Sequence, residues 1–388
     1  MTAFALDPEQ QEWCARLRTL AGERLRPLAE GGEPGRVNHA LLAEMGELGL
    51  LARAVTASAP GAARKGGTGR ALELCLLRES LAYSCPEAET ALALQGLGTG
   101  PVAQAGTEAQ RRRWLREAAS GRAVAAFALS EPEAGSDAAA LTLRADPDPA
   151  GGEGGAGAWR LTGTKTWISN APDADFYSVF ARTGEAPGAR GISAFLVPAD
   201  RPGLRGEPLA MLSPHPIGTL TFDGVPVTRE DLLGEQGRGF GVAMRTLNLF
   251  RPSVGAFAVG MAQAALDASL EHAAERRAFG GVLRDLQSVS HQLAEMATRT
   301  EAARLLVYAA AAAYDRDDDG IARSAAMAKL MATETAQYVV DTAVQIHGAA
   351  ALRQGHLLEH LYREVRAPRI YEGASEVQRT LIAKELYR

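Results

Sequence analysis

The spacing of apolar residues changes twice along this chain of 388 residues, and that change constrains the fold more than any other feature. Up to residue 121, apolar residues recur at three- and four-residue steps, as in Leu72 and Leu76, which is typical of helices. From residue 122 to residue 233 they alternate with polar residues, as in Leu220-x-Phe222, which is typical of strands. The longest turn-forming run, residues 146–157, is predicted to be a hairpin loop without chemistry. From residue 234 the helical pattern returns, so we predict three domains, at 1–121, 122–233 and 234–388.

Composition excludes several classes of function. Forty-one basic residues against 46 acidic ones give a net charge of −5, which argues against a nucleic-acid partner. The three cysteines form no CxxC pair, and the seven histidines form no metal-ligand pattern, so we expect free thiols and no metal. The N-terminus lacks a basic-then-apolar signal segment, and we expect a cytoplasmic protein that does not contact membranes.

Two segments of the predicted β region carry residue types suited to binding a flat polar ligand. Residues 127–137, with the sequence FALSEPEAGSD, present successive backbone N–H groups and a hydroxyl, which suit a ring edge or a diphosphate. Taken alone, these residues are better explained as a capped turn. In the second segment, KTWISN (165–170), Trp167 and Ser169 lie two residues apart on a strand and are expected to share a face. The alternative is that Trp167 is a core residue.

Two further segments lie in the C-terminal helical region. Arg276, in ERRAFG (275–280), suits a phosphate, because its guanidinium donates two parallel hydrogen bonds, although a surface charge is the simpler interpretation. The last segment runs from QIHG (345–348) to IYEGAS (370–375). There Glu372 stands between an aromatic residue and a glycine; taken alone, such a glutamate is a surface residue.

Together and in this order, these segments resemble the acyl-CoA dehydrogenase family of flavoenzymes, and the resemblance covers nearly the whole chain. Residues 261–267 (MAQAALD) resemble the start of the family's C-terminal helical domain. The resemblance implies an α+β multidomain subunit with an N-terminal helical domain, a middle β-barrel or sandwich and a C-terminal four-helix bundle. It also implies FAD, an acyl-CoA substrate oxidised to its trans-2-enoyl form, electron-transfer flavoprotein as acceptor, and a homotetramer or dimer.

The resemblance also assigns roles to residues. Glu372 matches the base that removes the α-proton while the β-hydrogen leaves as hydride to flavin N5, and its backbone N–H would hold the thioester carbonyl together with a flavin ribityl hydroxyl. In some family members the base instead precedes the arginine matching Arg251; here that residue is Phe250, which cannot accept a proton. The substrate-side positions are Ser136, Asn248, Arg251 and Gly373. The positions that match FAD contacts are Phe127, Leu129, Ser130, Gly135, Ser136, Trp167, Ile168, Ser169, Arg276, Phe279, Gln287, Gln345, Gly348, Ala349, Ala374 and Glu376.

The chain departs from the family pattern at a few of these positions. Residues 348–351 read Gly-Ala-Ala-Ala where the family often has Gly-Gly-x-Gly, and the extra methyl groups narrow the approach to a diphosphate. Ala374 lacks a hydroxyl often found there, and Asn248 stands where an aspartate is frequent. His347 is expected to be packed and not catalytic.

Three alternatives to a CoA-linked dehydrogenase remain open on the same fold. The substrate is then an acyl-carrier-protein thioester, or the electron acceptor is O₂, as in an oxidase. The third alternative is a catalytically idle scaffold, which the alanines at 349–351 and 374 favour and which the presence of Glu372 opposes.

Overall fold

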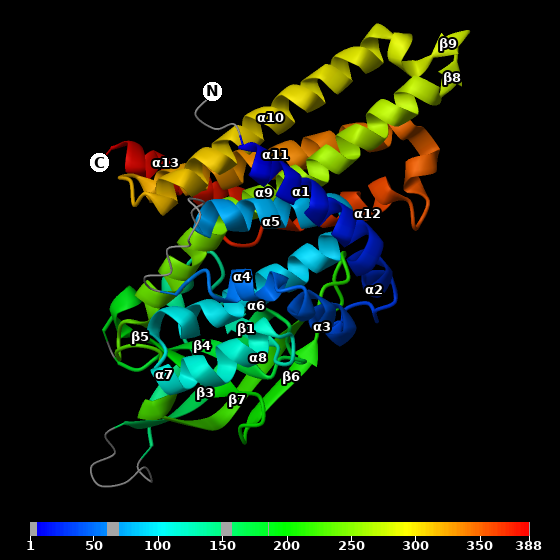
Figure 1. The fold of residues 1–388 in the computed structure, drawn as a ribbon. Coiled ribbons are helices and arrows are strands. Elements are labelled where there is room, and N and C mark those ends of the chain that lie inside the picture. Colours follow the sequence, from blue (N-terminus) through cyan, green and yellow to red (C-terminus); the bar gives the residue numbers. More distant parts are fainter. Residues whose placement is uncertain (1–5, 60–69, 149–156, 185, 388) are drawn as a thin grey trace. The chain divides into compact units, whose positions relative to one another are not determined.

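The computed structural model describes residues 6–59, 70–148, 157–184 and 186–387, which fall into two compact units (Figure 1). Unit 1 comprises residues 1–27, 63–89 and 248–388, and unit 2 comprises residues 28–62 and 90–247. The expected order of helical, β and helical regions is confirmed. The three consecutive domain ranges stay a prediction, because grouping by contacts joins segments that are far apart in the sequence.

Unit 2 is built on one seven-stranded sheet that forms a half-barrel. Six strands follow the order β1-β4-β2-β3-β7-β6, and β5 pairs with β4. The antiparallel pair β2–β3 confirms the predicted hairpin, whose loop residues 149–156 lie outside the described residues. The strands are β1 (Ala125–Ala128), β2 (Arg144–Pro147), β3 (Ala158–Ser169), β4 (Phe176–Arg182), β5 (Ile192–Pro198), β6 (Leu204–Pro208) and β7 (Ile217–Thr228).

Helix α6 (Pro86–Ala105) fixes the edge strand β1 of this sheet. The buried Gln95 amide donates to the Ala123 carbonyl over 2.7 Å and accepts from the Ala125 N–H over 2.7 Å. Gly98 allows close approach, since a Cβ there would lie 2.6 Å from the Ala125 backbone. The shorter helices of unit 2 are α3 (His39–Glu47), α4 (Leu50–Val55), α7 (Glu108–Gln110) and α8 (Arg116–Ala119), and α2 (Arg26–Glu30) spans the boundary between units.

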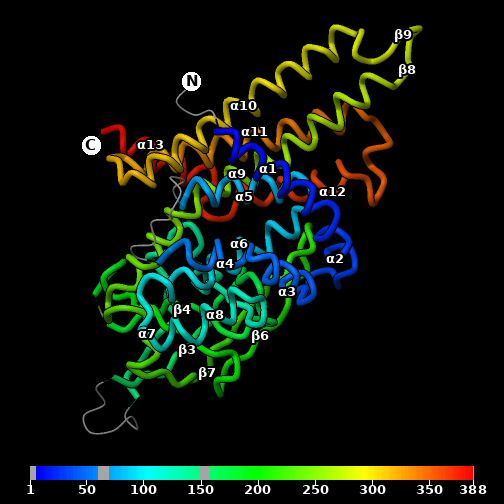
Figure 2. The backbone as a smooth tube through the Cα atoms, viewed as in Figure 1, coloured from blue at the N-terminus to red at the C-terminus, as the bar shows by residue number. Residues whose placement is uncertain are grey.

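Unit 1 is a layered group of helices in which α10 packs along α11, and α1 and α10 both pack on α5 (Figures 1 and 2). The N-terminal helix therefore shares a unit with the C-terminal ones. Residues 261–267 lie within α9, which already begins at Gly239, so they do not mark the start of the C-terminal helices. The elements are α1 (Pro8–Leu20), α5 (Arg70–Ser84), most of α9 (Gly239–Glu275), β8 (Arg277–Ala278), β9 (Gly281–Val282), α10 (Gln287–Asp315), α11 (Ile321–His347), α12 (Leu357–Glu364) and α13 (Ser375–Leu386).

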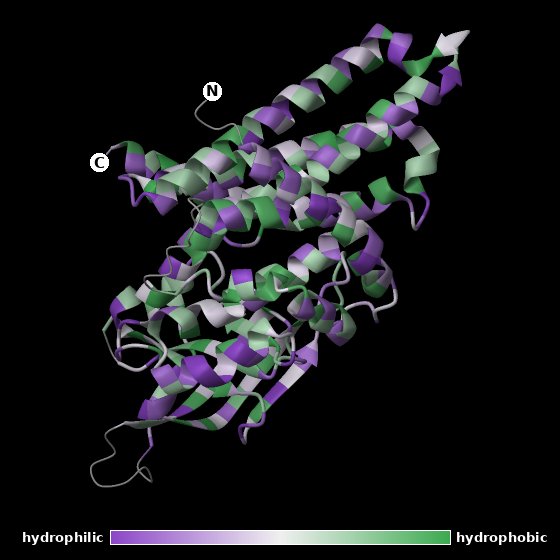
Figure 3. Ribbon diagram, in the orientation of Figure 1, coloured by the Kyte–Doolittle hydropathy of each residue, from purple (hydrophilic) through white to green (hydrophobic). Residues whose placement is uncertain are grey.

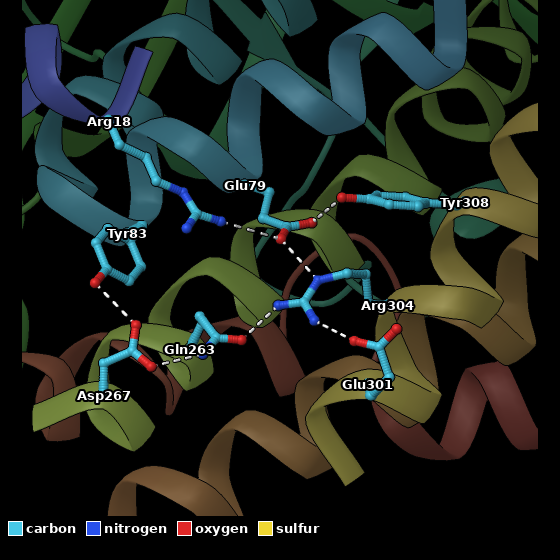
Figure 4. Close-up of polar contacts among 8 residues, drawn as sticks. All are labelled: Arg18, Glu79, Tyr83, Gln263, Asp267, Glu301, Arg304 and Tyr308. Atoms are coloured by element: carbon cyan, nitrogen blue, oxygen red, sulfur yellow. Dashed lines mark hydrogen bonds and ion pairs between the residues drawn. The ribbon is translucent and has the colours of Figure 1, made fainter. Parts of the chain in front are cut away.

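A polar network ties α5, α9 and α10 together inside unit 1 (Figure 4). The buried Glu79 carboxylate accepts from Arg304 Nε over 2.9 Å and from the Tyr308 hydroxyl over 2.8 Å. Arg304 also donates to Gln263 of α9 over 2.7 Å. Buried polar groups stabilise a fold when their partners are present, so this network fixes the relative register of the three helices.

Among the described residues, α9 alone is long and apolar enough to cross a membrane by length and composition, and 78% of its most apolar stretch is buried. A buried core helix satisfies the same test. Along α10, hydrophobic and hydrophilic residues are interspersed (Figure 3).

Replacing Gly98 with alanine should destabilise the protein, because the added methyl group meets backbone atoms of β1 that cannot move aside. We expect the free energy of unfolding to fall by about 2 kcal/mol, as measured by urea denaturation. Gly241→Ala is the matched control: it is also a helical glycine of unit 2, but the nearest atom to its added Cβ is the flexible Arg245 guanidinium at 3.4 Å. Equal stability of the two variants would contradict the proposed α6–β1 contact.

Candidate functional site

A buried ion pair joins two of the predicted ligand-binding segments in unit 2. Lys165, which has no exposed surface, donates over 2.8 Å both to Glu131 Oε1 and to the Leu129 carbonyl. The Glu131 carboxylate also accepts from the backbone N–H groups of Thr142, over 2.6 Å, and Leu143, over 2.9 Å. Segments 127–137 and 165–170 are therefore held side by side, as both serving one ligand would require.

The pKa shifts of the pair follow from burial and mutual attraction. Burial lowers the pKa of Lys165 to about 8, although the Glu131 carboxylate opposes the change. Burial alone would raise the pKa of Glu131, but the Lys165 ammonium and the backbone donors bring it below its ordinary value. Glu131 is therefore ionised at neutral pH.

Trp167 lies on an irregularity of β3. The β3–β7 register shifts between Lys165 and Ile168, and Trp167 has a φ of 58°. This bulge interrupts the regular alternation on which the shared face of Trp167 and Ser169 was predicted. The indole is 54% exposed, so the alternative that Trp167 is a core residue is wrong. The bulge presents an aromatic surface to solvent while Ile168 stays buried.

The other predicted residues of unit 2 differ in exposure. Leu129 and Ile168 are buried, and Phe127 packs its ring 4.9 Å from that of Phe180. Their side chains support the sheet, which leaves their backbone for any ligand contact. Gly135 and Ser136 are exposed, and a Cβ built at Gly135 would meet nothing within 4 Å. Ser130 and Ser169 are half-buried.

In unit 1, Glu372 lies in the turn between α12 and α13. Its φ of 50° and the φ of 97° at Gly373 place both in the left-handed region, and a Cβ at Gly373 would collide with Gln378. Glu334 of α11 anchors both flanks of the turn. Its carboxylate accepts from Ser375 Oγ over 2.6 Å and pairs with Arg369 over 3.0 Å.

The Glu372 carboxylate faces three positive charges from three helices. Arg78 comes from α5, Arg251 from α9 and Lys329 from α11, and each attracts the carboxylate electrostatically. Glu372 Oε2 is shielded from solvent and has no hydrogen-bond partner in the described structure, and the same holds for Arg251 Nε. A donor and an acceptor without partners at one place suit a polar ligand.

Burial raises the pKa of Glu372 above its ordinary value of 4.5, even though the three cations oppose the change. A carboxylate whose pKa is raised toward neutrality is a stronger base than an exposed one. This combination of desolvation and opposing charges marks Glu372 as a candidate base.

The structure brings the predicted substrate-side residues of unit 1 together. Arg251 donates to Asn248 Oδ1 over 2.8 Å on α9, and the Arg251 guanidinium also interacts electrostatically with Glu372. Phe250, the alternative position for a base, is fully buried. Asn248, in place of the frequent aspartate, therefore orients Arg251 without neutralising it.

Arg276, Phe279 and Gln287 gather at the β8–β9 hairpin and the start of α10. All three are exposed; Phe279 is 92% exposed and has a φ of 50°. Gln345 and Ala349 are exposed at the end of α11, where Gly348 has a φ of 64° and open space at its Cβ position. The methyl group of Ala351 is buried, so it does not narrow the exposed surface at Gly348.

The remaining predictions concern α13 and His347. Ala374 is the N-cap residue of α13 and provides no side-chain cap, so the missing hydroxyl noted in the sequence leaves the helix start without that hydrogen bond. Glu376 is exposed and pairs with Arg379 over 3.5 Å. His347 stacks on His272 with ring centroids 4.1 Å apart. In the described part of the chain, no group of three His, Cys, Asp or Glu residues could hold a metal ion.

Sequence reasoning missed four charged residues: Glu131, Lys165, Arg78 and Lys329. Glu131 and Lys165 lie inside motifs that were identified, but their burial was not anticipated. Arg78 and Lys329 lie in helices outside every motif, and both are buried, with exposures of 1% and 0%. Their signal was an isolated charge on an otherwise apolar helical face, as in Ala326-Met327-Ala328-Lys329.

Comparison with known proteins covers nearly the whole chain. Models of the acyl-CoA dehydrogenase N-terminal, middle and C-terminal domains match residues 7–122, 126–225 and 237–387. The mitochondrial short-chain specific acyl-CoA dehydrogenase of Sus scrofa is 37% identical over 378 residues, which are 96% of this chain and 88% of that protein. Cyclohexane-1-carbonyl-CoA dehydrogenase of Geobacter metallireducens is 34% identical over 376 residues, 96% of each chain.

Solved structures similar to this chain support the same family. Butyryl-CoA dehydrogenase from Megasphaera elsdenii has a TM-score of 0.88 and 32% identity over 100% of both chains. A structure named electron transferring flavoprotein of Acidaminococcus fermentans gives the same TM-score of 0.88, identity of 32% and coverage of 100%. The FAD complex of PigA has a TM-score of 0.86 and 26% identity over 100% of this chain and 99% of that one.

Lys165→Met should destabilise unit 2 strongly, because it leaves the Glu131 carboxylate buried without its cation. We expect a loss of about 3–5 kcal/mol in the free energy of unfolding, measured by urea denaturation. The double variant Lys165→Met/Glu131→Gln should recover part of this loss. Arg205→Met, which removes an exposed ion pair with Asp223, is the control and should change stability by about 0.5 kcal/mol or less. A Lys165→Met variant as stable as this control would show that the buried pair contributes nothing.

Proposed function

The chain belongs to the acyl-CoA dehydrogenase family of FAD-dependent oxidoreductases, and from this premise we propose that Glu372 is the base that removes the α-proton of an acyl-CoA thioester. The observation that carries the proposal is the Glu372 carboxylate itself: shielded from solvent on Oε2, without a hydrogen-bond partner there, and raised in pKa. The product is the trans-2-enoyl-CoA.

The α-proton of a thioester is a weak acid, so the site has two tasks. It keeps Glu372 basic by excluding water, and it offers donors to the thioester carbonyl as negative charge develops there. The left-handed φ of Glu372 turns its backbone N–H out of any helical hydrogen-bond ladder, which suits it to donate to that carbonyl. Arg251 and Lys329 both interact electrostatically with the Glu372 carboxylate and supply positive charge there.

The residues of unit 2 fit a flavin. An exposed indole at Trp167, a half-buried hydroxyl at Ser169 and open space at Gly135 suit a flat ring with polar edges and a phosphate-bearing tail. Bound FAD supplies the acceptor for the β-hydrogen as hydride. Trp167 would lie against the ring, and Ser130 and Ser136 would hold its polar groups.

We assign electron-transfer flavoprotein as the electron acceptor and a homo-oligomer, with a tetramer favoured over a dimer, as the working form. The first assignment is what the family resemblance implies, and one similar solved structure is named as an electron transferring flavoprotein. Exposed apolar side chains support the homo-oligomer. In an isolated subunit they would face water, whereas association with other subunits would cover them. They are Leu270, Phe279, Leu305, Leu306, Met327 and Leu352.

The test of function is the visible spectrum of the purified protein during anaerobic addition of a panel of acyl-CoAs. Bleaching of the flavin by one thioester supports the dehydrogenase and identifies the acyl group. If only acyl-carrier-protein thioesters bleach the yellow protein, the substrate is a carrier-protein thioester. Rapid release of peroxide in air would identify O₂ as the electron acceptor. A protein that cannot be reconstituted with FAD would favour the catalytically idle scaffold.

Glu372→Gln should retain FAD and acyl-CoA binding but lose about 10³-fold or more in the rate of flavin bleaching, because the amide cannot accept the α-proton. In the unaltered protein the rate should fall as the pH drops through the raised pKa of Glu372, above the ordinary 4.5, because protonated Glu372 is inactive. Stopped-flow bleaching against pH checks both. Full activity in the variant would refute the assignment.

Phe279→Asp should weaken the oligomer and release FAD, because a charge replaces a 92% exposed aromatic ring at the β8–β9 hairpin. Light scattering would report the mass, and the ratio of flavin to protein absorbance would report the cofactor. Tyr387→Asp, at an aromatic residue with 93% exposure near the C-terminus, is the matched control and should change neither. Unchanged mass and flavin content in Phe279→Asp would remove the hairpin from the proposed interface.

A further inference from the structure

A lysine inside unit 1 is bonded directly to the turn that carries Glu372. Lys329 lies on α11 and has no exposed surface. Its Nζ donates a hydrogen bond to the Gly373 carbonyl over 2.7 Å. Gln378 of α13 donates to the same carbonyl over 3.0 Å. Two side chains from two helices therefore fix one peptide group, the one that links Gly373 to Ala374.

The turn needs such external support. A left-handed φ is unfavourable for a residue with a side chain, and Glu372 has a φ of 50°. A residue in this state persists only where its surroundings determine the conformation. The bond from Lys329 to Gly373 supplies that restraint from a long helix, whereas Glu334 acts farther out, on Arg369 and Ser375.

The same lysine contributes to the charge around Glu372. The groups facing the carboxylate are Arg78 from α5, Arg251 from α9 and Lys329 from α11. Beyond them, Glu89 engages Arg78, and Glu334 and Glu376 act on Lys329. Arg78 attracts the Glu372 carboxylate most strongly of the three, and it also forms an ion pair with Glu89 and donates to Ser253 Oγ over 2.6 Å. Lys329 makes its hydrogen bond to a neutral carbonyl, and besides Glu372 its ammonium interacts with Arg251, Glu334 and Glu376.

We propose that Lys329 is a positioning residue for the base: it holds the Glu372–Gly373 turn through the Gly373 carbonyl and supplies a positive charge that favours the ionised carboxylate. This inference rests on the proposed role of Glu372. Lys329 then makes two contributions. Its hydrogen bond to Gly373 does not require a charge, whereas its electrostatic effect on Glu372 depends on pH.

The two contributions predict different pH behaviour. Burial lowers the pKa of Lys329 to about 8, although Glu372 opposes the change, so the ammonium is charged below pH 8 and neutral at high pH. Without this charge, the pKa of Glu372 rises, and the acid limb of the rate profile moves to higher pH. Loss of the hydrogen bond lowers the rate at every pH. Well above pH 8, where Lys329 is neutral in the unaltered protein, only the loss of the hydrogen bond distinguishes a variant from it.

The experiment compares Lys329→Met, Lys329→Gln and Lys329→Arg in the FAD-loaded full chain, by stopped-flow flavin bleaching from pH 5 to pH 9.5. For Lys329→Met we expect the acid limb to move up by about one pH unit and the plateau rate to fall about tenfold. Lys329→Gln should show the same shift with a smaller loss of rate, since the amide can still donate. Lys329→Arg should keep the acid limb in place. Lys384→Met, an exposed lysine of α13, is the control and should match the unaltered protein.

An acid limb that stays in place and a plateau rate within twofold in a folded, yellow Lys329→Met variant would overturn the inference. If that variant does not fold, the Gln and Arg variants decide: different acid limbs support the inference, and equal ones overturn it. Failure of the proposed function is distinguishable, because it would appear as an unaltered protein that no thioester bleaches or as an active Glu372→Gln variant.

Discussion

A half-buried carboxylate with one oxygen shielded from water is the constraint on which unit 1 depends. An isolated buried charge is strongly unfavourable, and a protein tolerates one only with compensating charges or a raised pKa. Glu372 has both: its pKa is raised by burial, and cations from α5, α9 and α11 surround it. These helices come from residues 70–84, 239–275 and 321–347, so placing three charges around one turn requires distant segments to pack in a single unit. The composition of unit 1, with an early helix among late ones, follows from that requirement.

In unit 2, by contrast, the buried charges have their hydrogen-bond partners within the protein. Lys165 and Glu131 satisfy each other directly, and backbone donors from Thr142 and Leu143 complete the shell of the carboxylate. A saturated pair of this kind has no capacity left for a ligand, so its role is to hold two segments together. Glu372 keeps one oxygen without a partner. The number of unsatisfied hydrogen bonds therefore separates a structural buried charge from one available for chemistry, where burial alone does not.

The sequence predicted the order of helical and β regions because periodicity is a local property, and the β2–β3 hairpin followed from its turn residues. It did not predict that α1 and α5 join the C-terminal helices, since such pairing depends on long-range packing that no local pattern records. Glu372 was found through its neighbours Tyr371 and Gly373. Lys329 was missed because its one signal, an isolated charge among apolar residues of an alanine-rich helix, is local, whereas its burial follows from the position of the Glu372 turn against α11.

Backbone strain marks positions where the periodicities of strand and helix break down. Five non-glycine residues of the described chain have a positive φ: Trp167, Asn170, Phe279, Asp317 and Glu372. Three of these five, Trp167, Phe279 and Glu372, match cofactor or base positions of the family, and the first and last depart from the regular geometry that a strand or helix would impose. A strained residue presents its side chain or N–H in a direction that regular secondary structure does not provide. The same departure removes such a residue from the periodicities of strand and helix, so Trp167, Phe279 and Glu372 were found through sequence motifs and not through periodicity.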